Sequence, residues 1–228
     1  MEILLPALLA FILGLAHFFG EEFDEYTSSY NFLFISFSAG FTVAYFFSVL
    51  IPEVMANLSL PVQNASIVFG FSIFYVLEEV LYEKGGNLGN IKTEFKEAHT
   101  LFIILYHISI GTMFVFLEKE SIVQLTLFFL PVFFHTLVNS LAIKEMHEEM
   151  LDNLFVKIVS SLSALIGVLI GSFLTIPVSV LYSILGVLGG AFIYIVVHDA
   201  LDPRSERPVG FILGVSIFVI LMIFGTAI

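Results

Sequence analysis

The segment "FFLPVFFHTLVNSLAI", residues 128–143, consists of aliphatic and aromatic side chains interrupted by His135 and Asn139. Its length and its lack of a polar face predict a helix in an apolar environment, where a helix satisfies its own backbone hydrogen bonds. Polar side chains are costly in that environment. His135 and Asn139, which lie one helical turn apart, therefore indicate either a functional site or a hydrogen bond between helices.

The rest of the chain shares this composition. Hydrophobic residues make up 59% of the 228 residues and charged residues only 12%, and the mean hydropathy is +1.04. Uncharged stretches of about twenty residues separate the clusters of charge, a length that crosses the hydrocarbon core as helix. These features predict an integral membrane protein, and the first apolar run is interpreted as a retained span rather than a signal peptide. The absence of cysteine excludes disulfides and thiolate metal sites.

Eight spans fit the chain, which predicts one all-α transmembrane domain over residues 1–228 with an internal loop at 83–99. The spans are expected at 3–19, 31–52, 64–82, 100–117, 122–143, 154–173, 176–197 and 208–227. Seven of the eight Lys and Arg residues then lie on one side, and only Lys119 lies on the other. The positive-inside rule therefore places both termini outside. The plasma membrane is the expected location of the protein. The net charge of −12 lies in the loops and gives no reason to expect a nucleic-acid partner.

Two of these spans share a pattern of small residues, then Phe, then Tyr, then Pro. The second span carries "SAGFTVAYFFSVLIPE" at 38–53, and the seventh carries "GGAFIYIVVHDALDP" at 189–203. Because the two spans cross in opposite directions, the pattern predicts an inverted repeat, with three-helix bundles flanking the fourth and fifth spans. Chance recurrence of Gly, Phe and Tyr in a Phe-rich chain is the alternative.

The fourth span, "LFIILYHISIGTMFVFL" at 101–117, carries its own histidine, His107. On the expected boundaries His107 and His135 lie at nearly the same depth in antiparallel neighbours, and Asn139 shares a face with His135. Neutral imidazole nitrogens and an amide oxygen are competent ligands for a divalent first-row metal. The sequence thus predicts a metal site formed by His107, His135 and Asn139, with hydrogen bonding between helices as the alternative.

The order of these motifs resembles the ZIP (Zrt/Irt-like) metal transporters over the full chain. The second-span motif is the most specific piece, followed by the histidine-led fourth and fifth spans and the seventh-span motif. The resemblance implies eight spans in a 3+2+3 arrangement and a divalent metal, zinc above all, as transported cargo. In that family the fourth span carries His-Asn/Ser-x-x-Asp/Glu-Gly, and the fifth carries His-x-x-Pro-Glu-Gly or a close variant.

This chain departs from both family motifs. His107 and His135 match the leading histidines, but Gly111 and Asn139 stand at the carboxylate positions. The Asn/Ser position of the fourth span holds Ile108, and the Pro and Gly positions of the fifth span hold Val138 and Ser140. We expect a carboxylate introduced at Gly111 or Asn139 to face the two imidazoles and to strengthen metal binding.

The sequence therefore favours transport of a divalent metal through a site poor in carboxylates. A ZIP-like protein that no longer transports, and that binds or senses metal or regulates a partner, is the alternative. No Ser-His-acid set, paired aspartates or H-E-x-x-H lies within the spans, so no enzymatic activity is expected. The expected partners are the lipid bilayer and the metal ion, and a homodimer is left open. His17 and Glu21, four residues apart at the end of the first span, are interpreted as a solvated end of that span, with transfer of cations at the mouth of a pathway as the alternative.

Overall fold

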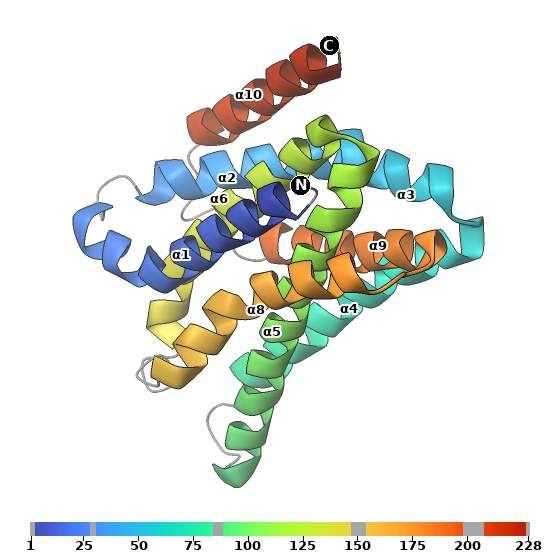
Figure 1. Ribbon diagram of the computed structural model, residues 1–228. Helices are drawn as coiled ribbons and strands as arrows, with labels where there is room; N and C mark the ends of the chain where they lie inside the picture. Colours follow the sequence, from blue (N-terminus) through green and yellow to red (C-terminus); the bar gives the residue numbers. More distant parts are fainter. Residues whose placement is uncertain (1–2, 28–30, 84–88, 147–153, 198–207, 227–228) are drawn as a thin grey trace.

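The computed structural model describes residues 3–27, 31–83, 89–146, 154–197 and 208–226, and these residues are helical apart from short connections (Figure 1). Three elements, α2, the π-helical η1 and α3, form one continuous helix, so the described part of the chain contains eight helical segments. The elements are α1 (Leu4–Thr27), α2 (Asn31–Tyr45), η1 (Phe46–Leu50), α3 (Ile51–Asn57), α4 (Leu60–Glu83), α5 (Gly89–Glu120), α6 (Ile122–Met146), α8 (Leu154–Phe173), α9 (Val178–Ile195) and α10 (Pro208–Thr226). The prediction of an all-helical fold is confirmed.

Four stretches of helix are long and apolar enough to cross a membrane: Phe32–Asn57, Leu101–Glu120, Val178–Ile195 and Pro208–Gly225. Four shorter apolar stretches accompany them: Leu4–Phe19, Leu60–Val76, Ile122–Val138 and Lys157–Phe173. On α10, large apolar side chains such as Ile212 and Phe224 are 62% and 68% exposed, as lipid-facing side chains would be. These helices identify a membrane protein with transmembrane helices.

The predicted internal loop at 83–99 is wrong in its second half. Helix α5 begins at Gly89 and runs for 32 residues to Glu120, so its first turns precede the apolar span. The sequence "NIKTEFKEAH" at 90–99 contains Lys, Glu and Ala, which favour helix in water, whereas the preceding "GG" does not. The helix is therefore longer than its apolar part.

The helices pack in pairs that repeat across the bundle. The most extensive contacts join α2 to α10, α4 to α9, α5 to α8, and α1 to both α8 and α6. The contacts keep their pattern when corresponding helices are exchanged: α1 with α8, α2 with α9, α4 with α10, and α5 with α6. This exchange turns the α2–α10 contact into the α9–α4 contact. It also turns the α5–α8 contact into the α6–α1 contact. The same exchange maps α2–α6 onto α9–α5, whereas the contact of α1 with α5 has no counterpart among the larger contacts described.

Glycines allow these pairs to approach closely. Three helices carry a G-x-x-x-G motif: "GVLIG" at 167–171, "GVLGG" at 186–190 and "GFILG" at 210–214. One glycine of each motif lies against a glycine-containing turn of the partner helix, and a Cβ at either glycine would lie 1.9–2.1 Å from a carbonyl oxygen opposite. The pairs are Gly167 with Gly111, Gly190 with Gly70, and Gly214 with Gly40. Small residues thus replace the hydrophobic effect as the means of holding helices together in lipid.

A π-helical turn interrupts the second span. Pro52 has no N–H to donate to the carbonyl four residues earlier, and the preceding residues, Phe46–Leu50, widen into a π-helix. A π-helical turn also begins at Val196, after α9. Both turns follow the tyrosine of the shared motif, Tyr45 in one span and Tyr194 in the other. The two segments therefore share a local backbone feature as well as a sequence pattern.

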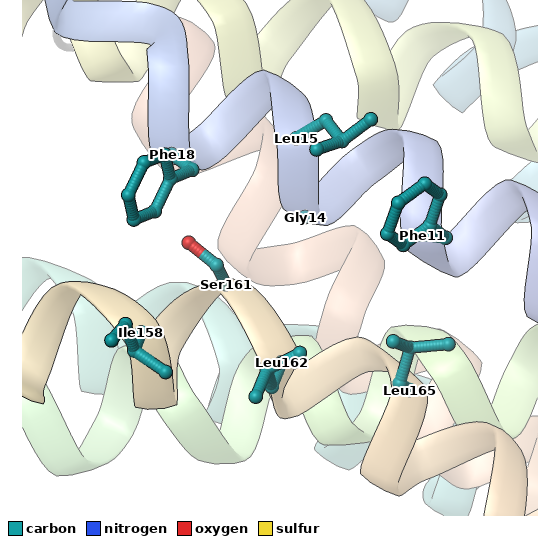
Figure 2. A pocket seen from close by; sticks show the side chains of 8 residues that line it. All are labelled: Phe11, Gly14, Leu15, Phe18, Ile158, Ser161, Leu162 and Leu165. Carbon is teal, nitrogen blue, oxygen red and sulfur yellow. The ribbon is translucent and has the colours of Figure 1, made fainter.

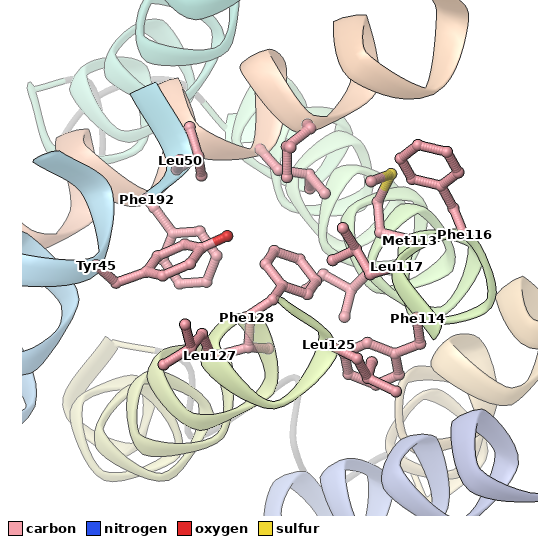
Figure 3. Packing of buried hydrophobic residues seen from close by; sticks show 14 of the residues in the cluster. Tyr45, Leu50, Met113, Phe114, Phe116, Leu117, Leu125, Leu127, Phe128 and Phe192 are labelled. Carbon is pink, nitrogen blue, oxygen red and sulfur yellow. The ribbon is translucent and has the colours of Figure 1, made fainter. Parts of the chain in front are cut away.

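An aromatic cluster fills the centre of the bundle (Figure 3). The Phe128 ring lies 5.9 Å from Phe114 and 6.0 Å from Tyr45, and Tyr45 lies 6.0 Å from Phe218, measured between ring centroids. These residues come from α6, α5, α2 and α10, and the three phenylalanines are fully buried. Edge-to-face packing of this kind adds to the burial of apolar surface. The cluster thus connects α2, from the first three helices of the repeat, with α10, from the last three.

Candidate metal centre

His107 lies on α5 with only 7% of its surface exposed. Its Nδ1 is 3.1 Å from the carbonyl oxygen of Ile103, one turn earlier in the same helix. A carbonyl oxygen only accepts hydrogen bonds, so Nδ1 carries the proton and donates it. Nε2 of the neutral ring therefore keeps its lone pair. Histidines that bind metals commonly have their second nitrogen held by a backbone carbonyl in this way.

His135 lies on α6, which contacts α5, and it is 6% exposed. Its ring packs edge-on against Phe192 of α9, with centroids 5.1 Å apart. His107 and His135 are close enough to interact electrostatically. Both predicted histidines are thus buried on contacting helices, as the comparison of their depths indicated. Their binding of metal stays a prediction, and the side chain of Asn139 lies outside the residues that the structure describes.

A third histidine, His17, joins this cluster from α1. The rings of His17 and His107 have centroids 5.3 Å apart and planes inclined by 57°. The interpretation of His17 as a solvated end of the first span is therefore wrong, because α1 continues to Thr27 and the His17 ring turns into the bundle. Glu21 lies outside the described side chains. Three helices, α1, α5 and α6, each contribute one imidazole.

The three imidazoles are arranged as pairs that share His107. Among the described side chains, no group of three or more His, Cys, Asp or Glu residues is placed to hold one metal ion together. An ion bound by two imidazoles completes its coordination with water or with other oxygen donors, as ions in open metal sites do. The described residues thus bring the His107 ring against His17 and within electrostatic reach of His135.

Gly111 does not face this cluster. A Cβ at Gly111 would lie 1.9 Å from the carbonyl oxygen of Ala164 on α8 and 2.8 Å from its carbon. The expectation that a carboxylate at Gly111 would face the imidazoles is therefore wrong, because the glycine allows α5 and α8 to touch. Only the expectation for Asn139 stays open.

Aromatic rings surround the imidazoles. Tyr106 lies 5.8 Å from His107 and 5.8 Å from Phe192, again between ring centroids. Its hydroxyl is buried and has no hydrogen-bond partner among the described residues. Walls of this kind exclude water and lower the local dielectric constant, which strengthens the interaction of a cation with any ligand present.

A carboxylate on a neighbouring element is held in other contacts. Glu53 of α3 accepts a hydrogen bond from Nε2 of Gln124 at 2.7 Å and a longer one, 3.4 Å, from Nδ2 of Asn57. The Gln124 bond connects α3 to α6 and brings the end of one span to the start of another, whereas the Asn57 bond lies within α3.

Neither a protein-family model nor a curated protein matches this chain. The function is therefore argued from the buried imidazoles and the helices that carry them.

Proposed function

We propose that the protein transports a divalent metal cation across a membrane through a site between α5 and α6. His107 and His135 supply nitrogen ligands, and Asn139 is placed one turn from His135 to supply an oxygen. The observation that carries the proposal is the state of His107. It is buried, its Nδ1 is committed to the Ile103 carbonyl, and its Nε2 is available as a ligand.

The chemistry of these ligands suits a transported ion rather than a stored one. Imidazole is a preferred ligand for zinc and its first-row neighbours, and zinc is the expected cargo. Two neutral rings leave the double charge of the ion uncompensated in surroundings where charge is expensive. Binding is therefore weak, and an ion must be able to leave its site for transport to proceed.

The arrangement of the helices supports a ZIP-like architecture. The paired contacts, the two π-helical turns and the shared motif are all expected of an inverted repeat in a 3+2+3 bundle. The distribution of Lys and Arg supports termini outside the membrane, and we place the protein in the plasma membrane. In this orientation the aromatic cluster around Phe114 and Phe128 lies on the outer side of the two histidines.

The same cluster also fits a second function. Ile110, Met113, Phe114, Phe128 and Val132 have no exposed surface, so these residues pack without a water-filled path between them. A protein that binds or senses metal, or that regulates a partner, would need no such path. A transporter closed on its outer side would show the same packing, so the two functions differ in ion flux rather than in binding.

The binding site is tested by removing one imidazole at a time. We expect His107→Ala and His135→Ala each to abolish most Zn²⁺ binding by the detergent-purified protein. The double variant should lose little more, because ligands that act as a unit are non-additive. Equilibrium dialysis with Zn²⁺ measures this directly. Unchanged Zn²⁺ binding, with small additive losses of stability, would show that the histidines only join helices.

A further inference from the structure

We infer that His17 is a third ligand of the transport route and forms a second cation subsite with His107. This inference rests on the proposed function, since it extends the route from the α5–α6 site toward α1. The ion would pass from the pair His107–His135 to the pair His107–His17, with His107 common to both. The ligand class is a divalent first-row metal ion bound through imidazole nitrogen.

The geometry of the two rings suits a shared ion. If two imidazoles share a tetrahedral zinc at about 2.0–2.1 Å from each nitrogen, their ring centroids lie about 5 Å apart. The His17 and His107 centroids are 5.3 Å apart, and the rings are tilted by 57° rather than stacked. His107 also keeps Nε2 available, because Nδ1 is bound to Ile103.

A close helix crossing holds His17 in this position. Gly14, one turn before His17, lies against α8 so closely that a Cβ there would be 2.3 Å from the carbonyl oxygen of Ser161. Figure 2 shows this crossing, with Phe18 of α1 beside the side chain of Ser161. The groove at the crossing has a volume of about 170 Å³ and is lined mainly by apolar side chains. The following turn of α1 is thereby fixed, so the contact of His17 with His107 does not depend on a loop.

A positive charge near His17 favours release of the cation from this subsite toward the inner side. Lys157 of α8 repels positive charge on His17, and its Nζ lies 4.9 Å from the centroid of the Phe18 ring. Lys157 lies near the first residue of α8. This end of the helix is on the side of the membrane where most Lys and Arg residues are expected, which is the inner side in the proposed orientation. A cation beside His17 is therefore held more weakly than one between His107 and His135. Weak binding at the inner end favours release.

The test uses Co²⁺ alone as the probe, because its visible absorption reports nitrogen ligands directly. The full-length protein in detergent is titrated as wild type, His17→Phe, Lys157→Met, His107→Ala and His135→Ala. Phenylalanine at position 17 keeps the ring contact with His107 but removes both nitrogens. Methionine at position 157 keeps an apolar stem against Phe18 but removes the charge.

We expect His17→Phe to weaken Co²⁺ binding by about tenfold or more and to change the absorption. Loss of a residue that only supports a metal ligand typically lowers metal affinity by about tenfold or more, and loss of a ligand itself should lower it at least as much. Lys157→Met should tighten binding through the removal of repulsion. Affinity and absorption like wild type in both variants, with binding lost in His107→Ala, would overturn the inference and leave the proposed function standing.

If binding also survives in His107→Ala and His135→Ala, the proposed function fails together with the inference. If His17→Phe does not fold, Lys157→Met decides alone: tighter binding supports the inference, and unchanged binding overturns it.

Discussion

Replacement of Gly111 by aspartate is expected to leave little folded protein. The new Cβ would lie 1.9 Å from the Ala164 carbonyl oxygen and 3.0 Å from the Val168 backbone nitrogen. Neither helix is able to withdraw locally, because the packing is reciprocal: a Cβ at Gly167 of α8 would lie 2.0 Å from the Ile108 carbonyl oxygen. Overpacking costs about 1–3 kcal/mol or more, and a buried unpaired carboxylate adds several kcal/mol. Together these approach the whole stability of a typical domain.

The steric part of this prediction is isolated with alanine. Gly111→Ala is compared with Gly171→Ala, a glycine of the same α5–α8 interface whose Cβ would meet its nearest neighbour at 3.1 Å. We expect a clear fall in the thermal unfolding midpoint for Gly111→Ala and a small change for Gly171→Ala. Equal midpoints for the two variants would contradict the close approach of α5 and α8.

Replacement of Phe128 by alanine is expected to destabilise the protein by about 3–5 kcal/mol. The side chain is fully buried, and its ring contacts both Phe114 and Tyr45, so its loss leaves a cavity between α2, α5 and α6 (Figure 3). Rigid neighbours on three helices prevent the cavity from closing.

The matched control for this change is Phe224→Ala. Phe224 is 68% exposed on α10, so its ring can be removed without a cavity. Unfolding in detergent, followed for both variants, should show a large loss of stability for Phe128→Ala and almost none for Phe224→Ala. Similar losses in the two variants would show that the aromatic cluster is not the core of the bundle.

The hydropathy of the chain predicted the helices because each span must satisfy its own backbone in lipid. Hydropathy did not predict the start of α5, because it detects the part of a helix that lies in lipid and not the part that extends into water. The Lys, Glu and Ala residues at 90–99 carried the missing signal, through their helix propensity. The G-x-x-x-G motifs at 167–171, 186–190 and 210–214 were also readable, but the partner of each helix was not.

The site was predictable in part for the same reason. Equal depth in neighbouring antiparallel spans indicated that His107 and His135 would lie on contacting helices, which the bundle confirms. His17 was assigned to a solvated span end, ahead of a role at the mouth of a pathway, because it lies near the end of an apolar run and close to acidic residues. The sequence did not show that Gly111 faces α8 rather than the imidazoles. The contact between α5 and α8, which are far apart in the sequence, decides which way this position faces.

The central claim is that the two buried histidines carry a divalent metal across the membrane. The most direct measurement is Zn²⁺ uptake into proteoliposomes that hold a metal-sensitive dye, with wild type, His107→Ala and His135→Ala reconstituted in equal amounts. We predict uptake by the wild type that saturates with Zn²⁺ concentration and is lost in both variants, while both still fold. Wild-type uptake no faster than that of empty liposomes, or uptake unchanged in both histidine variants, would contradict the account.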